Sequence, residues 1–210
     1  IPERNIYNLP EGLSIKEAPI AEPTAVALHA VELGEKSISK DIKSSKVLVI
    51  GGGAIGLLCG LILSKVKKCN DIVIVDPNNK RLKECSKYLD ATSVNPESKV
   101  IIDNSFDMVF DTVGLEVTRL QAIKSIKPGG VIIHVGLTQP SGSFDFRKAT
   151  LQEITFIGTY CYTNRDFKKT LNILSNKDLG SLNWIEYRSL KDGVKAFQDI
   201  HNGSCSAPKI

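Results

Sequence analysis

Glycines at fixed spacing are the first residues in this chain whose pattern suggests chemistry. The run Gly51-Gly52-Gly53-Ala54-Ile55-Gly56 fits G-x-G-x-x-G and joins an apolar run, Val47–Ile50, to a helical pattern. Gly51 permits a tight turn, Gly53 lets a pyrophosphate approach bare backbone, and Gly56 lets the helix pack closely on the strand. Ala54 and Ile55, at the start of the helix, would offer free N–H groups to the phosphates. The run predicts a dinucleotide-binding turn, with a plain tight turn between strand and helix as the alternative.

A carboxylate stands where the same pattern places the ligand of the ribose. Asp76 ends a second apolar run, Ile72–Val75, twenty residues beyond Gly56. A carboxylate there can accept both ribose hydroxyls of an adenosine and repels a 2′-phosphate, which favours NAD over NADP. Arg81, five residues later, is expected to lie against the adenine face, although an arginine nearby could also receive a 2′-phosphate. The structural alternative is that Asp76 caps the helix that follows Pro77.

Two later strand ends are expected to lie over the same crevice. Thr112 and Val113 follow one apolar run, and Gly136 and Leu137 follow the next. In open α/β sheets, ligands bind outside the carboxyl ends of the strands, so these four residues are expected to hold the nicotinamide ribose and carboxamide. Asp111 precedes the first pair. We expect it to bind backbone amides rather than to act as a catalytic acid.

The spacing of the apolar runs indicates which elements position these residues. Five short runs rich in β-branched residues are expected to be strands, and helical patterns lie between most of them. The expected strands are Val47–Ile50, Ile72–Val75, Met108–Phe110, Val131–Val135 and Ile154–Ile157, and the expected helices are Ala54–Val66, Asn79–Leu89, Val117–Ser125 and Asp166–Leu174. Continuously apolar strands separated by helices are typical of a parallel sheet buried on both faces. The sequence therefore predicts an α/β fold, a Rossmann-type doubly wound parallel sheet with an N-terminal helical lead-in.

The same pattern divides the chain into three parts. Residues 1–45 are interpreted as a lead-in with helical patches at Ser14–Ala18 and Glu22–Leu33, the second of which Gly34 should end. Residues 46–180 form the expected nucleotide-binding domain. Residues 181–210 hold a connector with Trp184, a final helix, Leu190–Ile200, and a tail.

Composition and charge exclude several classes of protein. The 210 residues carry 27 Lys and Arg against 23 Asp and Glu, and the net charge of +4 is too weak and too dispersed to indicate nucleic acid binding. A hydrophobic fraction of 42% excludes a disordered chain. The uncharged stretch Val47–Leu63 has seventeen residues, five of them glycines, which is too short for a membrane span. Five cysteines without a C-x-x-C pair favour the reducing cytoplasm.

Taken together, these motifs resemble the cofactor-binding half of the zinc-type medium-chain alcohol and polyol dehydrogenases. The similar segments are residues 21–30 with Glu22-Pro23, Gly51–Gly56, Asp76 with Arg81, residues 106–114, residues 127–136, residues 157–160 and residues 207–210. They cover nearly the whole chain in the family's order. Residues 158–167 and 179–188 are most similar to sugar-alcohol and sugar-phosphate dehydrogenases. The resemblance implies NAD as the cofactor, zinc in the intact protein, and a small alcohol or polyol as the substrate.

One part of the family's pattern is absent. In the family, a separate N-terminal domain supplies the zinc ligands from a Cys and a Gly-His-Glu motif, and this chain has neither. His29, His134 and His201 are isolated, with no Cys at ligand spacing, and His29 and His134 are expected to be structural. In polyol-type relatives the Glu of the Glu-Pro motif lies near the zinc, so Glu22 is the candidate metal ligand. Its alternative role is that of a carboxylate favoured at a helix N-terminus. No catalytic residue is expected in this chain.

The first residue is not Met, and we therefore expect a fragment. The helix at Glu22–Leu33 and the tail beyond Gly203 should then face an absent catalytic domain and be mobile or exposed. The resemblance also implies a dimer formed through the edge strand Ile154–Gly158, because an unpaired apolar edge invites pairing. We expect neither nucleic acid nor a membrane as a partner.

Three functions stay open at this point. The leading one is NAD-dependent, zinc-assisted hydride transfer from a secondary alcohol. The second is a non-catalytic NAD-binding or redox-sensing module. The third is a zinc-independent quinone-type reductase, which would prefer NADPH, and both Asp76 and Glu22-Pro23 speak against it.

Overall fold

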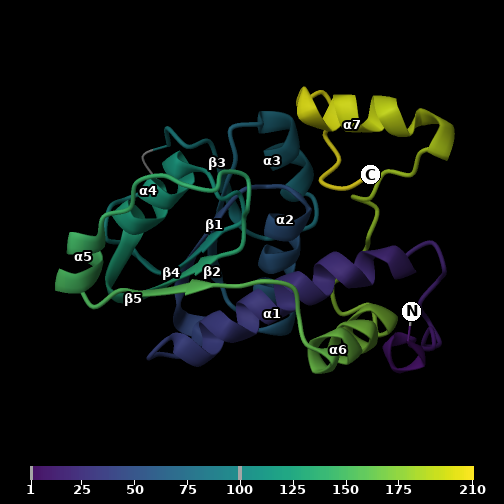
Figure 1. Ribbon diagram of the computed structural model, residues 1–210, viewed down its shortest axis with the longest axis horizontal. Helices are drawn as coiled ribbons and strands as arrows, with labels where there is room; N and C mark the ends of the chain where they lie inside the picture. Colours follow the sequence, from purple (N-terminus) through teal and green to yellow (C-terminus); the bar gives the residue numbers. More distant parts are fainter. Residues whose placement is uncertain (1, 99–100) are drawn as a thin grey trace.

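A six-stranded sheet forms the centre of the computed structural model, which describes residues 2–98 and 101–210 (Figure 1). The strands are β1 (Lys46–Ile50), β2 (Asp71–Val75), β3 (Thr92–Val94), β4 (Phe106–Asp111), β5 (Ile126–His134) and β6 (Thr155–Gly158). Within the described residues, their order is β3-β2-β1-β4-β5-β6, and all neighbours are parallel. The strand order reverses beside β1, and such a switch point is where open α/β sheets bind ligands. The predicted Rossmann-type fold is confirmed.

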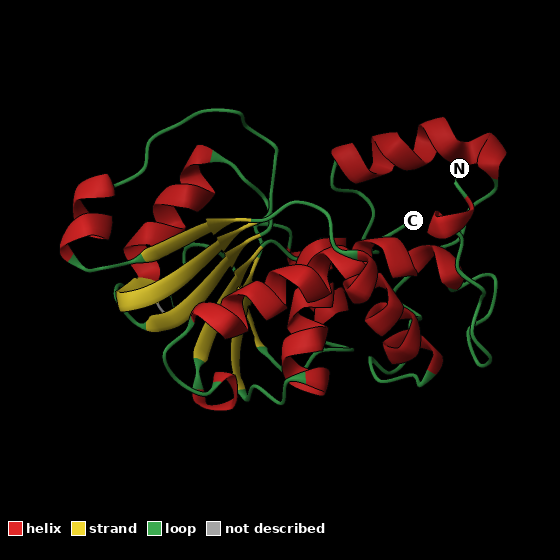
Figure 2. Cartoon of the chain, turned by 60° about the horizontal axis from the view of Figure 1, so that its bottom comes forward, coloured by secondary structure: helices red, strands yellow, loops and turns green. Residues whose placement is uncertain are grey.

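Helices cover both faces of the sheet (Figure 2). On one face lie α1 (Ala21–Ser37), α2 (Ala54–Leu61), α3 (Asn79–Cys85) and α6 (Asn164–Ser175), and on the other lie α4 (Glu116–Ser125) and α5 (Phe146–Leu151). The last helix, α7 (Gly193–His201), lies at the periphery of the molecule, away from α5 (Figures 1 and 2). A π-helical turn, Ile62–Val66, continues α2, and short 3-10 helices are found at Glu3–Asn5, Ala18–Ile20, Ile42–Ser44 and Leu190–Asp192.

The buried residues of the central strands β1, β2, β4 and β5 are mostly apolar because each face of these strands meets a separate core. Successive side chains of a strand point to opposite faces of the sheet. Along β1, Val47 and Val49 enter the core beneath α1 and α2, whereas Leu48 and Ile50 enter the core beneath α4. This double burial explains why β1 does not alternate between apolar and polar residues.

Helix α1 differs from the sequence prediction in three respects. Gly34 does not end the helix. A glycine that ends a helix usually has a positive φ, which Gly34 does not have, and here it permits close packing instead. A Cβ at Gly34 would lie 2.7 Å from Sδ of Met108 in β4. The helix is not exposed either, since Ala25, Ala27 and Leu28 are fully buried. The patch expected at Ser14–Ala18 is a turn followed by a 3-10 helix.

Other elements follow the prediction with small changes at their ends. The final helix begins as the 3-10 turn at Leu190, is continued by α7, and closes at Gly203 with a φ of +65°. The sequence patterns predict neither strand β3 nor helix α5. The uncharged stretch Val47–Leu63 forms β1, the glycine turn and most of the helix after it. Within residues 2–98 and 101–210, we find no helix whose length and apolar character would let it cross a membrane.

Candidate cofactor-binding site

The glycine turn between β1 and α2 has the geometry that the motif predicts. Gly51 has a φ of +105°, and its N–H donates to the Val75 carbonyl at 2.8 Å. A Cβ at Gly56 would lie 1.8 Å from the Gly51 carbonyl oxygen, so a side chain is impossible there without moving the backbone. A Cβ at Gly53, by contrast, would have no neighbour within 4 Å. Gly53 thus faces open space in front of α2, whose first N–H groups have no partner within the helix.

Asp76 closes the next strand and holds the glycine turn. Its side chain is buried and accepts three hydrogen bonds, from Gly52 N at 2.8 Å, Asn78 N at 2.8 Å and an Arg81 guanidinium nitrogen at 3.2 Å. The alternative role of Asp76 as a helix cap is wrong, because Asn78 is the residue that caps α3 and, of the backbone amides around the start of that helix, Asp76 accepts only from the amide of Asn78, before the helix begins. A carboxylate has about four lone-pair sites, so Asp76 has capacity for one more donor.

An apolar slot of about 270 Å³ lies beside the glycine turn, at the ends of β1, β2 and β4. Its walls are Ile50, Gly51, Val75, Pro77, Pro96, Val113, Leu115, Val117, Thr118 and Gln121. A flat apolar ring fits such walls, and the adenine of a dinucleotide would reach the slot when its ribose is at Asp76. The predicted contact of Arg81 with the adenine face stays a prediction, because this guanidinium pairs with Asp76.

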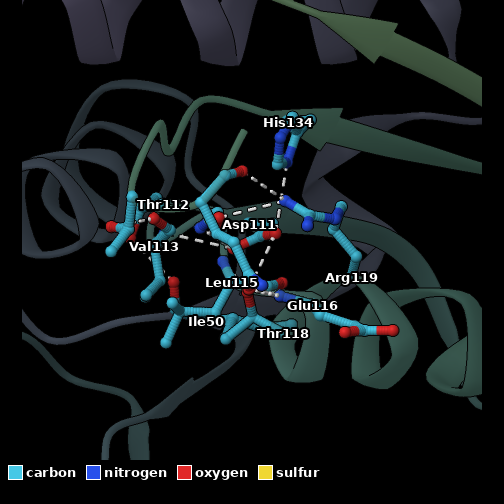
Figure 3. Close-up of polar contacts among 12 residues, drawn as sticks. Ile50, Asp111, Thr112, Val113, Leu115, Glu116, Thr118, Arg119 and His134 are labelled. Carbon is cyan, nitrogen blue, oxygen red and sulfur yellow. Dashed lines mark hydrogen bonds and ion pairs between the residues drawn. The ribbon is translucent and has the colours of Figure 1, made fainter. Parts of the chain in front are cut away.

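Asp111, at the end of β4, is enclosed by donors from the protein itself (Figure 3). One of its oxygens accepts from Val113 N at 3.1 Å and Gly114 N at 2.9 Å, and the other from Thr118 Oγ1 at 3.1 Å and His134 Nδ1 at 3.2 Å. Burial raises the pKa of Asp111, but these hydrogen bonds outweigh it, so the pKa lies below its ordinary value. The expectation that Asp111 binds backbone amides is confirmed.

The turns after β4 and β5 touch backbone to backbone. A Cβ at Gly136 would lie 2.1 Å from the carbonyl carbon of Val113, and the Thr112 hydroxyl donates to the Ile50 carbonyl at 2.7 Å. Arg119 of α4 donates to the carbonyl of Gly114 at 3.0 Å and to that of Gln139 at 3.2 Å. The structure therefore brings Gly51, Thr112, Val113 and Gly136 to one edge of the sheet, and the Leu137 side chain there is exposed.

Two of the three histidines, His29 and His134, have the structural roles that the sequence indicated. His29 pairs with Asp166 and His134 with Asp111, while His201 lies exposed at the end of α7. Glu22 lies exposed in the first turn of α1. In the part of the chain that the structure describes, no three His, Cys, Asp or Glu side chains gather as a metal site would require. These residues do not fit a complete zinc centre.

Sequence reasoning missed several residues of the site. Gly52 is buried and donates to Asp76, and its place inside the glycine run could have indicated this. Thr118 and Arg119 organise the turns after β4 and β5, but no local pattern marks them. Pro96 reaches the apolar slot from the segment after β3, a strand that the sequence analysis did not identify.

The comparison with known families fits this geometry. The profile of the zinc-binding dehydrogenase family matches residues 54–176, more than half of the chain. The chain therefore belongs to the zinc-binding dehydrogenase family. The predicted resemblance to the zinc-type dehydrogenases is confirmed.

Individual relatives narrow the comparison to polyol enzymes. The chain is 30% identical over 207 residues to D-xylulose reductase of Saccharomyces cerevisiae, which takes in 92% of this chain and 56% of the relative. It is 25% identical over 211 residues to sorbitol dehydrogenase 1 of the same yeast, which takes in 93% of this chain and 57% of the relative. The chain thus spans about half the length of the curated relatives it matches.

A solved structure supports the fold independently. Acetophenone reductase from Geotrichum candidum in complex with NAD matches with a TM-score of 0.86 at 19% identity, over 98% of this chain and 58% of that chain. At this identity the likeness concerns the fold alone.

Proposed function

We propose that this chain is the NAD-binding part of a zinc-dependent alcohol or polyol dehydrogenase, which transfers a hydride between a secondary alcohol and NAD. The observation that carries the proposal is the open space at Gly53, directly before α2 and beside the apolar slot. The similarity to D-xylulose reductase and sorbitol dehydrogenase supports a polyol as the substrate class. It also favours this function over a quinone-type reductase and over a non-catalytic NAD-binding module.

Each part of NAD has proposed partners in this chain. The N–H groups of Gly53, Ala54, Ile55 and Gly56 would hold the pyrophosphate, helped by the partial positive charge of the α2 N-terminus. Asp76 would accept from the adenosine ribose, with Gly51 and Arg81 beside it. Thr112, Val113, Gly136 and Leu137 would hold the nicotinamide half. Bound NAD supplies the hydride acceptor, and the protein orients it and keeps water away from the adenine.

The zinc and the remaining substrate walls are proposed to come from the portion of the relatives that this chain does not match. Glu22 is the one ligand we propose from this chain. Residues 46–180 would form the nucleotide-binding domain, with 1–45 and 181–210 connecting it to the catalytic part. This chain alone should bind NAD yet oxidise no polyol. Zinc-dependent turnover by these 210 residues in a polyol panel would contradict that division.

Cofactor choice gives the direct test of the proposal. Titration calorimetry with NADH and NADPH should show tighter binding of NADH, since a 2′-phosphate next to the Asp76 carboxylate meets like charge at short range. Asp76→Ser should reduce the ratio of NADH affinity to NADPH affinity about tenfold or more. The control is Asp71→Ser, the same exchange at the exposed start of β2, which should leave the preference unchanged. Equal or tighter NADPH binding by the unmodified chain would overturn the assignment of Asp76.

Self-association through β6 is part of the proposal. This strand is the edge of the sheet, and Phe156 on it is 43% exposed. Phe146 and Leu137 are also exposed, and together with Phe156 they line a cavity of about 540 Å³. We expect a two-fold dimer in sedimentation experiments at tens of micromolar. Phe156→Lys should weaken it, and Ile15→Lys, on an exposed residue of the lead-in, should not. A monomer in the unmodified chain would refute the dimer.

The proposed compartment is the cytoplasm. All five cysteines are free thiols in the structure, and four of them are buried. Free cysteines are typical of proteins in reducing compartments.

A further inference from the structure

One carboxylate oxygen links the first long helix to the loop that follows the edge strand. Oδ2 of Asp166 accepts from Thr163 N at 2.9 Å, from Thr163 Oγ1 at 2.7 Å and from His29 Nδ1 at 2.8 Å. Asp166 N donates back to Thr163 Oγ1 at 3.2 Å, which completes a capping box at the start of α6. His29 comes from α1 and is distant in sequence, so it adds a tertiary contact to a local motif.

The charge state of this group is set by its surroundings. Burial raises the pKa of Asp166, but the hydrogen bonds from Thr163 and His29 outweigh it, so the pKa lies below its ordinary value. The carboxylate is therefore ionised near neutral pH, and His29 Nδ1 must carry a hydrogen to contact it. A second ion pair, Lys169 to Glu32 at 2.7 Å, joins the same two helices without touching Asp166.

The loop of residues 159–163, between β6 and α6, is fixed at both ends. Thr159 N donates to the His134 carbonyl at 3.0 Å, and Thr163 is the N-cap of α6. Between them, Cys161 has a φ of +54°, a left-handed conformation that a residue with a Cβ adopts only when its neighbours hold it there. The Tyr162 ring stacks on Phe167 of α6 with 5.5 Å between ring centroids.

The sheet order relates this loop to the binding mode proposed above. In that mode the adenosine would lie at Asp76 after β2, and the pyrophosphate would cross the α2 N-terminus beside β1. The other half of the cofactor must then extend over the ends of β4 and β5 towards β6. The loop begins at the carboxyl end of β6, so it borders that half.

We propose that His29 is a positioning residue: by holding Asp166, it sets the loop of residues 159–163 as a wall for the nicotinamide half of NAD. In this proposal His29 acts only through its contact with Asp166. The inference rests on the proposed function, because it needs a dinucleotide in the crevice. According to the inference, the shape of the nicotinamide half of the site depends on a contact between α1 and α6, which lies outside the glycine motif.

Two ligands that differ only in the nicotinamide half test the proposal by calorimetry. His29→Leu removes the donor to Asp166, and we expect NADH to bind about tenfold more weakly while ADP-ribose, which lacks the nicotinamide, stays within about twofold. His29→Asn, whose amide can donate from a similar place, should recover most of the NADH affinity. Lys169→Met is the matched control: it breaks the other pair between α1 and α6 and should change neither affinity.

A second measurement is independent of any cofactor. Tyr160 in the loop is exposed and offers a cleavage site to chymotrypsin. Limited proteolysis should cut the loop faster in His29→Leu than in the unmodified chain or in Lys169→Met. Unchanged cleavage would overturn the positioning role.

The possible failures are distinguishable. Equal weakening of NADH and ADP-ribose in His29→Leu, or a selective loss of NADH in Lys169→Met, would mean general helix packing and would overturn the role of His29. If the unmodified chain bound neither ligand, the proposed function itself would be wrong, and the inference would fall with it. If His29→Leu did not fold, the test would use His29→Asn alone. A tenfold loss of NADH affinity in His29→Asn, with ADP-ribose affinity unchanged, would contradict the expected recovery.

Discussion

Asp76 and Asp111 occupy equivalent places in the sequence, yet the protein treats them differently. Asp111 is the last residue of β4 and Asp76 directly follows β2, so both lie at the carboxyl ends of parallel strands, and both are buried. Asp76 accepts three hydrogen bonds from the protein, whereas Asp111 accepts four. Since a carboxylate offers about four acceptor sites, Asp111 is saturated and Asp76 is not. A strand-terminal aspartate is thus a ligand candidate only where the neighbouring turns leave part of it free.

The two halves of the crevice at the carboxyl ends of the strands differ in the same way as these two aspartates. The half at β1 and β2 has open space at Gly53 and an apolar slot, while in the half at β4 and β5 the turns contact each other directly. The first half therefore has room that a ligand could occupy. The second is held by a network around Asp111 that fixes where its backbone groups lie.

Replacing Asp111 should give the largest effect. Asp111→Ala would remove an acceptor from four donors, of which Thr118 still has the Leu115 carbonyl, and we expect the free energy of unfolding to fall by about 3–5 kcal/mol. Asp76→Ala, which frees fewer donors at a site with room for water, should cost about 1–3 kcal/mol. Urea denaturation followed by circular dichroism measures both. Equal losses would show that the difference in donor number does not matter.

Substitutions of Gly53 and Gly56 should separate an effect on binding from an effect on stability. Gly56→Ala places a methyl against the Gly51 carbonyl and should cost up to about 3 kcal/mol of stability. Gly53→Ala fills only open space, so thermal unfolding should hardly change, while NADH affinity should fall strongly because the methyl occupies the approach of the pyrophosphate. If both variants lose stability alike, the separate roles of these glycines are wrong.

The Asp111 network should also weaken in acid. The pKa of Asp111 is lower in the folded chain than its ordinary value of 3.8, so the unfolded state binds the proton more readily. The stability from this group is complete above about pH 4 and is lost as the pH falls through the folded-state pKa. The difference in stability between the unmodified chain and Asp111→Asn should therefore narrow between pH 6 and pH 3. A constant difference across this range would contradict the lowered pKa.

Removing one donor from Asp111 should give the smallest effect. Thr118→Val deletes the hydroxyl that donates to Asp111, and we expect a loss of about 1 kcal/mol. Thr138→Val deletes a hydroxyl of the same region that is exposed and donates to the Val113 carbonyl, and it should cost less than about 0.5 kcal/mol. Denaturant midpoints would resolve the two, and the reverse order would count against the network as the source of rigidity.

Much of the fold could be predicted from local patterns, because five of the six described strands contain a continuous apolar run and the glycine motif fixes a turn. Where prediction failed, tertiary contacts decided. Gly34 looks like a helix stop in the sequence, but Met108 of β4 requires a small residue at that point of α1. Strand β3, with the sequence Thr-Ser-Val, is too short and too polar for its pattern to predict it; its pairing with β2 is the reason it is a strand.

The candidate site shows the same division. The motif residues of the glycine turn and Asp76 could be predicted because their spacing reflects one local unit of strand, turn and helix. The pairing of His29 with Asp166 could not, since nothing near either residue indicates the other. The sequence also did not predict that Glu22 is exposed, and the role of Glu22 as a metal ligand stays a prediction.

The central place of β1 in the sheet affects how the chain can fold as it is synthesised. Ile50 pairs with Val75 on one side and with Asp111 on the other. Until β4 has left the ribosome, β1 is an edge strand whose unpaired N–H and C=O groups belong to an apolar run. Such an edge can pair with another chain, so a nascent or proteolysed fragment that stops before β4 should aggregate. That exposure ends once Phe106–Asp111 has docked beside β1.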